Sequence, residues 1–149
     1  MARQPTSVLF ACTFNSIRSP MAEALLKHLH GRRIYVDSAG VRASEIDPFA
    51  VAAMEEIGID IRRHRAKTFD ELEDTSFDLV VSLSPEAQHS AVELTRTMSC
   101  ELEFWPMLDP SAVEGSREEM LGAYRLVRDQ LRRRILERFP LSPGAGGLR

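Results

Sequence analysis

One cysteine and one arginine stand at the two ends of a short loop in this sequence. Cys12 follows the apolar run 7–11, and Arg18 comes six residues later, directly before a stretch with helical spacing. A loop that enters a helix N-terminus can point several backbone N–H groups at one spot, and the helix dipole adds partial positive charge there. The guanidinium of Arg18 can add a two-pronged hydrogen bond to an oxyanion. The stretch 12–19 therefore predicts an anion-binding cradle.

Cys12 is the residue of this cradle that could form a covalent bond. The positive field of the loop favours the thiolate form, and the Ser19 hydroxyl can donate a hydrogen bond to it. A thiolate at the floor of an oxyanion cradle suggests attack on phosphorus, with a phosphocysteine intermediate. The Cys-x5-Arg spacing alone is weak evidence. The alternative is a buried cysteine in an ordinary strand-to-helix turn, with Arg18 at the surface.

Asp109 is the candidate for the proton transfers that such chemistry needs. It lies in Leu108-Asp109-Pro110, just past the apolar run 101–105. A carboxyl group there could protonate a leaving oxygen and then activate water. Taken alone, an Asp-Pro pair is more typical of a turn. The expected position on the same sheet edge as Cys12 favours the catalytic interpretation.

The elements that must position these residues alternate along the chain. Strands are predicted over 7–11, 34–36 (ending at 37–40), 77–83 and 101–105. Helices are predicted from Ser19, after the caps Asp47-Pro48 and Ser84-Pro85, and after the capping box of Ser116 and Glu119. The strand runs are too apolar for a sheet with one wet face, so a parallel sheet covered on both sides is expected. Ligands bind such sheets at the carboxyl ends of the strands, which is where Cys12 and Asp109 fall.

Composition excludes several classes of protein. The 149 residues include 19 basic and 22 acidic ones, a formal charge of −3, which argues against general nucleic-acid binding. Two cysteines cannot form a disulfide framework or a four-cysteine zinc site, and neither His64 nor His89 has a metal-ligand partner at useful spacing. We find neither a run long enough to span a membrane nor a signal peptide. We therefore expect a cytoplasmic protein without metal or cofactor.

The stretch 8–24 (VLFACTFNSIRSPMAEA) resembles the signature of low-molecular-weight protein tyrosine phosphatases, whose superfamily includes thioredoxin-type arsenate reductases. Softer matches are Ser38-Ala39-Gly40, Gly58-Ile59-Asp60 and 78–81, and a specific one is Asp109-Pro110. The resemblance covers residues 6–139. It implies a three-layer α/β sandwich with a four-stranded parallel sheet and helices on both faces. One domain is expected over 1–140, a monomer in the family's manner, with a disordered tail over 141–149.

The resemblance also implies roles for individual residues. Cys12 would be the nucleophile, Arg18 the phosphate clamp and Asp109 the general acid and base. Ser19 would stabilise the thiolate, Asn15 would hold the loop shape, and Ser38 would form a hydrogen bond with Asn15. Four further loop residues would lend backbone N–H groups to the phosphate: Thr13, Phe14, Ser16 and Ile17. With Asn15, Arg18 and Ser19 they would form the phosphate-binding loop.

Three departures from the family pattern affect specificity. Phe14 stands where a glycine is usual, so its bulk could narrow or re-aim the mouth of the site. Ile17 replaces a second loop cysteine that protects the nucleophile in many members. The aromatic residues that usually wall a phosphotyrosine ring are missing after Gly40 and after Pro110, where Ser111 follows. Phosphate chemistry is expected, whereas phosphotyrosine specificity is doubtful.

Three functions remain open from the sequence. The favoured one is hydrolysis of a phosphomonoester, either a phosphorylated protein or a small molecule. The alternative is arsenate reduction with an external thiol. Cys100 is the other cysteine, and a sheet of this kind would place it roughly 15–20 Å from Cys12, too far for a disulfide. We therefore predict that Cys100 is structural. The third possibility is an oxyanion-binding module without catalysis.

Overall fold

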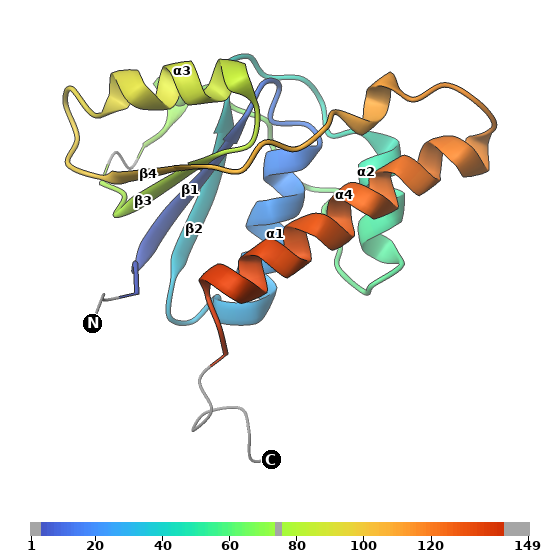
Figure 1. The fold of residues 1–149 in the computed structure, drawn as a ribbon, viewed down its shortest axis with the longest axis horizontal. Helices are drawn as coiled ribbons and strands as arrows, with labels where there is room; N and C mark the ends of the chain where they lie inside the picture. Colours follow the sequence, from blue (N-terminus) through green and yellow to red (C-terminus); the bar gives the residue numbers. More distant parts are fainter. Residues whose placement is uncertain (1–3, 74–75, 142–149) are drawn as a thin grey trace.

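Four parallel strands form the centre of the molecule, in the order β2-β1-β3-β4 (Figure 1). The structure is a computed structural model that describes residues 4–73 and 76–141. The strands are β1 (Ser7–Cys12), β2 (Tyr35–Gly40), β3 (Leu79–Ser82) and β4 (Glu101–Phe104). In the register of the sheet, Phe10 lies between Ser38 and Val81. The predicted four-stranded parallel sheet is confirmed.

Helices cover both faces of this sheet. They are α1 (Arg18–His30), α2 (Pro48–Glu55), α3 (Pro85–Leu94) and α4 (Arg117–Arg138), with short 3-10 turns η1 (Phe69–Glu71) and η2 (Pro110–Ala112). Helix α1 packs on β1 and β2, and α4 packs across α1 and α2, whereas α3 lies on the opposite face against β1, β3 and β4 (Figure 1). The expected three-layer α/β sandwich is therefore the observed one.

The alternation of side chains along β1 explains why both faces need a helix layer. Val8 and Phe10 point to the α1–α4 side, and Leu9 points to the α3 side, and all three are fully buried. A strand that is apolar on both faces is stable only between two covering layers. Helix α4 contributes one buried stripe to the larger core, as its spacing predicts: Leu121, Tyr124, Val127, Leu131 and Ile135.

The predicted helix starts are present in detail. Asp47 accepts hydrogen bonds from the backbone N–H groups of Phe49 and Ala50, and Ser84 accepts one from Ala87. Ser116 and Glu119 form the reciprocal capping box at the start of α4. Strand ends differ slightly from prediction. Strand β2 runs on to Gly40, because its last residues pair with the end of β1, and β3 begins at Leu79 rather than at residue 77.

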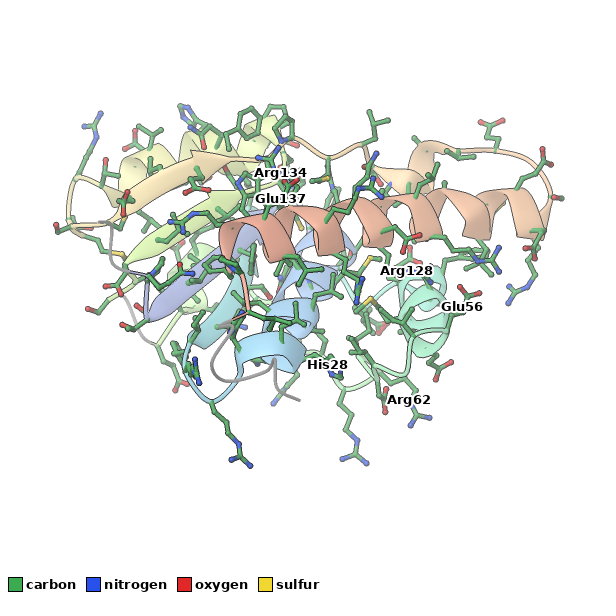
Figure 2. The ribbon with its side chains drawn as sticks, turned by 60° about the horizontal axis from the view of Figure 1, so that its bottom comes forward. His28, Glu56, Arg62, Arg128, Arg134 and Glu137 are labelled. Carbon is green, nitrogen blue, oxygen red and sulfur yellow. The ribbon has the colours of Figure 1, made fainter. Side chains whose placement is uncertain are left out.

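An ion-pair cluster joins the C-terminal end of α2 to the middle of α4. Arg128 Nη1 donates to Glu56 Oε1 at 2.8 Å and to the carbonyl of Ala53 at 2.8 Å, and Arg125 pairs with the same carboxylate at 2.7 Å. Figure 2 shows Arg128 and Glu56 facing each other between the two helices. The hydrogen bonds from Arg125 and Arg128 lower the pKa of Glu56 to about 2. These ion pairs and hydrogen bonds hold α2 against α4.

The strands that follow β1 in the chain are added to the sheet on opposite sides of it. From β1 the chain crosses to β2 on one side, and it then returns to β3 on the other, so the loop after β1 lies at the topological switch point. Within the described parts of the chain, no helix has the length and apolar character needed to cross a bilayer. The predicted tail over 141–149 lies, except for its first residue, outside the described residues.

Candidate active site

The loop between β1 and α1 is clamped along its length by residues 41–47, which we call the strap. Backbone N–H groups of the strap donate to successive loop carbonyls: Val41 to Cys12 at 3.2 Å, Arg42 to Thr13 at 2.8 Å, Ser44 to Phe14 at 3.0 Å and Asp47 to Ser16 at 3.0 Å. In a planar trans peptide the carbonyl and the next N–H point in opposite directions. With the carbonyls bound to the strap, the N–H groups on the other side of those peptides face away from it, as an anion cradle requires.

The tight path of this loop depends on two residues with special backbone properties. Asn15 has a left-handed φ of 53° and is fully buried. Asparagine tolerates this conformation better than most residues. Gly40 lies against the loop, where a Cβ would come within 2.8 Å of the Asn15 nitrogen and 2.4 Å of the Arg42 carbonyl oxygen. Only glycine therefore allows the strap to approach so closely.

Every polar group of the Asn15 side chain has a partner. Its Nδ2 donates to Ser19 Oγ at 2.8 Å and to Ser38 Oγ at 2.9 Å. Its Oδ1 accepts from the Lys67 backbone N–H at 3.0 Å and lies 3.0 Å from His64 Nε2. Together these contacts lock the left-handed turn in place.

The same contacts set the direction of the hydrogen bond to Cys12. Ser19 Oγ already accepts from Asn15, so its own proton is available for Cys12 Sγ, 2.9 Å away. The Ser19 backbone N–H also points at this sulfur, at 3.4 Å. Cys12 is only 2% exposed. Two donors therefore converge on a buried sulfur, an arrangement that stabilises a thiolate.

Sequence reasoning missed Glu23 and His64 as members of this network. Glu23, on α1, accepts from Ser38 Oγ at 2.5 Å and from Lys27 at 2.5 Å. Because the Asn15 Oδ1 can only accept, His64 must donate through Nε2, and its Nδ1 then lies 3.8 Å from Glu23 Oε1. Burial lowers the pKa of His64, against the opposing effect of the Glu23 carboxylate.

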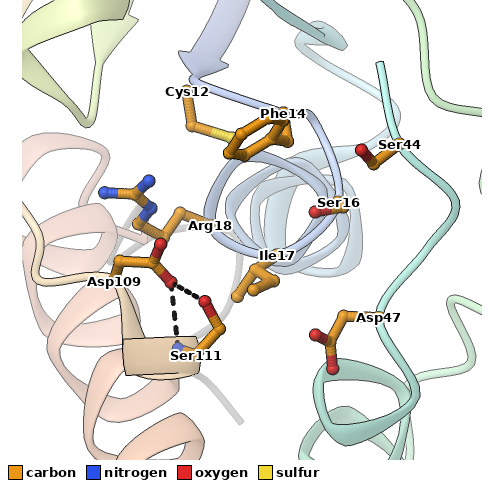
Figure 3. A pocket seen from close by; sticks show the side chains of 9 residues that line it. All are labelled: Cys12, Phe14, Ser16, Ile17, Arg18, Ser44, Asp47, Asp109 and Ser111. Carbon is orange, nitrogen blue, oxygen red and sulfur yellow. Dashed lines mark hydrogen bonds between the residues drawn. The ribbon is translucent and has the colours of Figure 1, made fainter. Parts of the chain in front are cut away.

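A pocket of about 150 Å³ opens above Cys12 (Figure 3). Its lining combines the predicted loop with two other segments, the strap and the stretch around η2: Cys12, Phe14, Ser16, Ile17, Arg18, Ser44, Asp47, Asp109 and Ser111. Arg18 is 7% exposed, and its Nη1 donates to the Met107 carbonyl at 2.9 Å, which ties it to the loop that carries Asp109. Thr13 turns away to Ser84, with its hydroxyl donating at 3.0 Å.

Asp109 both starts a turn and lies beside Cys12, the two placements weighed from the sequence. It caps η2, since its Oδ1 accepts from the Ser111 N–H at 2.9 Å and from Ser111 Oγ at 2.7 Å. It also lines the pocket together with Cys12 and Arg18 (Figure 3). The turn role therefore does not exclude the pocket role, because Ser111 engages one carboxylate oxygen and these bonds leave Oδ2 unused.

Asp47 was predicted only as a helix cap, and the structure adds it to the pocket lining. Its Oδ2 accepts from the Tyr124 hydroxyl of α4 at 3.0 Å. Burial and the neighbouring Asp47 carboxylate raise the pKa of Tyr124 well above its usual range. Within the described residues, no group of three or more histidine, cysteine or acidic side chains is arranged to hold a metal ion.

Cys100 lies at the opposite edge of the sheet. It precedes Glu101, which pairs with Leu79, which in turn pairs with Val8 at the start of β1. Strand geometry then separates the two cysteines by roughly 16 Å along the strands and roughly 10 Å across them. A disulfide needs Cα atoms within about 7 Å. Cys100 is therefore out of reach of Cys12 in this fold.

Comparison with known proteins places this geometry in a family. The model for low molecular weight phosphotyrosine protein phosphatases matches residues 7–137. An arsenate reductase of Halalkalibacterium halodurans is 41% identical over 129 residues, which cover 86% of this chain and 91% of that protein. A glutaredoxin arsenate reductase of Synechocystis sp. is 33% identical, covering 86% of this chain and 92% of the relative.

A solved structure agrees with these sequence matches. The YwlE arginine phosphatase from Geobacillus stearothermophilus superimposes with a TM-score of 0.69 at 26% identity, covering 90% of each chain. The relatives thus include proteins named for reduction of an oxyanion and one named for dephosphorylation. With the family match running through nearly the whole fold and the site described above, this chain belongs to the low molecular weight phosphotyrosine protein phosphatase family.

Proposed function

We propose that this protein reduces arsenate to arsenite with an external thiol as reductant. The observation that carries the proposal is a small oxyanion pocket with a single thiol, Cys12, at its floor and no second thiol in reach. The sequence alone favoured phosphomonoester hydrolysis. The relatives named arsenate reductases support the alternative more strongly. The pocket walls add weaker support, because Ser44 and Ser111 offer no ring to an aryl phosphate and Phe14 is the one aromatic side chain among the lining residues.

In the first step, the Cys12 thiolate attacks arsenic and a hydroxyl group of arsenate leaves. The bond between Sγ and arsenic forms, the As–OH bond breaks, and a proton from Asp109 converts the leaving hydroxide to water. Arg18 and the N–H groups of the loop bind the remaining oxygens and offset their charge. Ser19 keeps the sulfur ionised until it attacks. The product is a Cys12–arsenate thioester with arsenic still pentavalent.

In the second step, an external thiolate attacks Cys12 Sγ. The electron pair of the S–As bond passes to arsenic, which leaves as trivalent arsenite, and Cys12 is left in a mixed disulfide with the external thiol. A second external thiol then displaces Cys12 as thiolate. In sum, two thiols and one arsenate give one disulfide, arsenite and water. Cys100 has no part in this route.

A side-by-side assay tests the proposal. Purified protein is given arsenate with glutathione, arsenate with thioredoxin, or an aryl phosphate, and arsenite and phosphate release are measured. We expect arsenite with an external thiol, its loss in Cys12→Ser, and its retention in Cys100→Ser. Absence of arsenite with every thiol, while aryl phosphate is hydrolysed, would reject arsenate reduction.

Phosphomonoester hydrolysis is the second candidate, and the position of Asp109 favours it. A carboxyl group in the same pocket as Cys12 and Arg18 could protonate a leaving alcohol and then activate water for the phosphocysteine. Asp109→Asn should then slow release of poor leaving groups more than good ones. An equal loss for both would remove Asp109 from the acid role. Phosphate binding without either reaction would favour the non-catalytic module.

We also propose that the protein acts as a monomer in the cytoplasm and binds no nucleic acid. Both cysteines are free, which suits a reducing compartment. The cationic group of the site, Arg18, is buried in the pocket rather than on a basic surface. Gel filtration should give an apparent mass near 16.8 kDa, and a doubled value would contradict the monomer.

A further inference from the structure

The mouth of the pocket carries an aromatic ring that the family pattern does not supply. Phe14 lines the pocket and is 39% exposed. It is the one aromatic side chain among the described residues that line it. The Arg42 guanidinium carbon lies 5.7 Å from the centre of this ring. An exposed phenyl face beside a cation forms an amphipathic surface at the opening above Cys12.

The backbone fixes this pair in place. Arg42 donates from its N–H to the Thr13 carbonyl, and Ser44 donates to the Phe14 carbonyl, so the strap holds both sides of the pair in register. These bonds hold the two backbones in register, and the Arg42 guanidinium lies beside the Phe14 ring at the mouth.

Arg42 keeps most of its capacity to bind an anion. Its side chain is 58% exposed, and its ionic partner is Glu86, 54% exposed and 3.4 Å away. Such an exposed pair is worth little, because water and salt screen it. The carboxylates of the pocket, Asp47 and Asp109, lie across Ile17 and Arg18 from Phe14 in Figure 3. An incoming anionic group is thus repelled from them and attracted to Arg42.

We propose that Phe14 and Arg42 bind the second substrate, a small thiol that carries a carboxylate. This inference rests on the proposed function, which needs an external thiol to attack Cys12. The carboxylate would pair with Arg42, the carbon chain would lie on the Phe14 ring, and the sulfur would point down to Cys12 Sγ. The step served is the disulfide formation set out above, with arsenite as leaving group.

A charge series of thiols tests this selection. The rate with saturating arsenate is measured for 3-mercaptopropionate, 2-mercaptoethanol and cysteamine, each compared at equal thiolate concentration. The anionic thiol should give the highest kcat/KM and the cationic thiol the lowest. Arg42→Gln should reduce the ratio of anionic to neutral thiol about fivefold, the size expected for one exposed charge. Glu86→Gln should raise the ratio, and Arg132→Gln, on the outer face of α4, should leave it unchanged. An unchanged ratio in Arg42→Gln overturns the proposal.

A second measurement needs no arsenate chemistry. Cys12 alkylation by iodoacetate and by iodoacetamide is compared in the Cys100→Ser background. Arg42→Gln should lower the iodoacetate rate relative to iodoacetamide. One outcome is that arsenate is reduced while Arg42→Gln changes neither the thiol ratio nor the alkylation ratio. That result rejects thiol binding by Phe14 and Arg42 and leaves arsenate reduction standing. If no thiol supports reduction but the alkylation ratio falls, the function and the thiol assignment fail, while the anion preference of Arg42 is retained.

Discussion

The two cysteines occupy opposite edges of one sheet and have opposite surroundings. At the carboxyl edge, Cys12 is 2% exposed and receives two hydrogen bonds from Ser19. At the amino edge, Cys100 lines a wider cavity together with Asp78 and Glu101, and burial raises the pKa of its thiol. The same side chain thus receives two donors at one edge, whereas at the other edge burial favours the protonated thiol. The donors at Cys12, rather than its exposure, distinguish it, since Cys12 is the more buried of the two thiols.

This contrast follows from the direction of parallel strands. All carboxyl ends lie on one edge, where the loop after β1 enters α1 and collects N–H groups. The amino ends bring together the acidic side chains Asp78 and Glu101 and no helix N-terminus next to Cys100. The edge at which its strand places each cysteine therefore decides which groups surround it.

The largest expected effect is the loss of activity when serine replaces Cys12, and the matched control is the same replacement at Cys100. Cys12→Ser should reduce arsenate reduction by about 10³-fold or more, since a serine hydroxyl is a far weaker nucleophile at neutral pH. Cys100→Ser should change the rate less than about twofold, as expected for a thiol outside the site. Steady-state arsenite formation measures both. Comparable losses in the two variants would break the contrast between the edges.

Removal of the loop anchor should have the next largest effect. Asn15→Ala should reduce the free energy of unfolding by about 3–5 kcal/mol, because it deletes several buried hydrogen bonds and places a Cβ residue in a left-handed turn. Asn15→Gly loses the same bonds but tolerates the φ, so it should be about 1 kcal/mol less damaging. Urea denaturation followed by circular dichroism measures the difference. Equal stability of the two variants would dismiss the backbone part of this explanation.

Loss of one donor to Cys12 should be milder. Ser19→Ala should lower the rate of Cys12 alkylation by iodoacetamide at pH 7 about 10- to 100-fold, which corresponds to one hydrogen bond to a charged group. The matched control at the other edge is Ser99→Ala, beside Cys100. This variant should leave the rate of Cys12 alkylation unchanged. If Ser19→Ala reacts as fast as the parent protein, the donor set does not control Cys12.

The smallest expected signal is the labelling of Cys100 itself. Burial raises its pKa above the ordinary value of 9.0, so its thiolate fraction stays low at neutral pH and grows only as the pH rises past that value. In the Cys12→Ser variant, iodoacetamide labelling followed by mass spectrometry should therefore be slow at pH 7 and accelerate above pH 9. Rapid labelling at pH 7 would contradict a protonated thiol at this edge.

Local patterns predicted much of the fold correctly. The apolar run at 7–11, the caps at Asp47, Ser84 and Ser116, and the apolar stripe of α4 each depend on neighbours a few residues away. Such interactions are present in the sequence itself. The pairing of Cys12 with Ser19 was also predictable, since both belong to one strand–loop–helix unit.

The site beyond that unit depends on distant segments. His64 reaches Asn15 across 49 residues of sequence, and Asp47 enters the pocket while it caps α2. Neither residue lies in a local pattern that specifies its partner. The direction of the Phe14 ring was likewise undecided until the strap and Arg42 were placed beside it.

The sequence by itself determined which groups are available to this protein: a thiol and an arginine on one strand-to-helix loop, and a carboxyl group that a parallel sheet brings to the same edge. The tertiary structure alone decided which groups surround that thiol, from the network behind Asn15 to the ring and cation at the mouth. The physical reason is that backbone propensity and capping act between near neighbours, whereas hydrogen bonds and burial at the site join segments that only packing brings together.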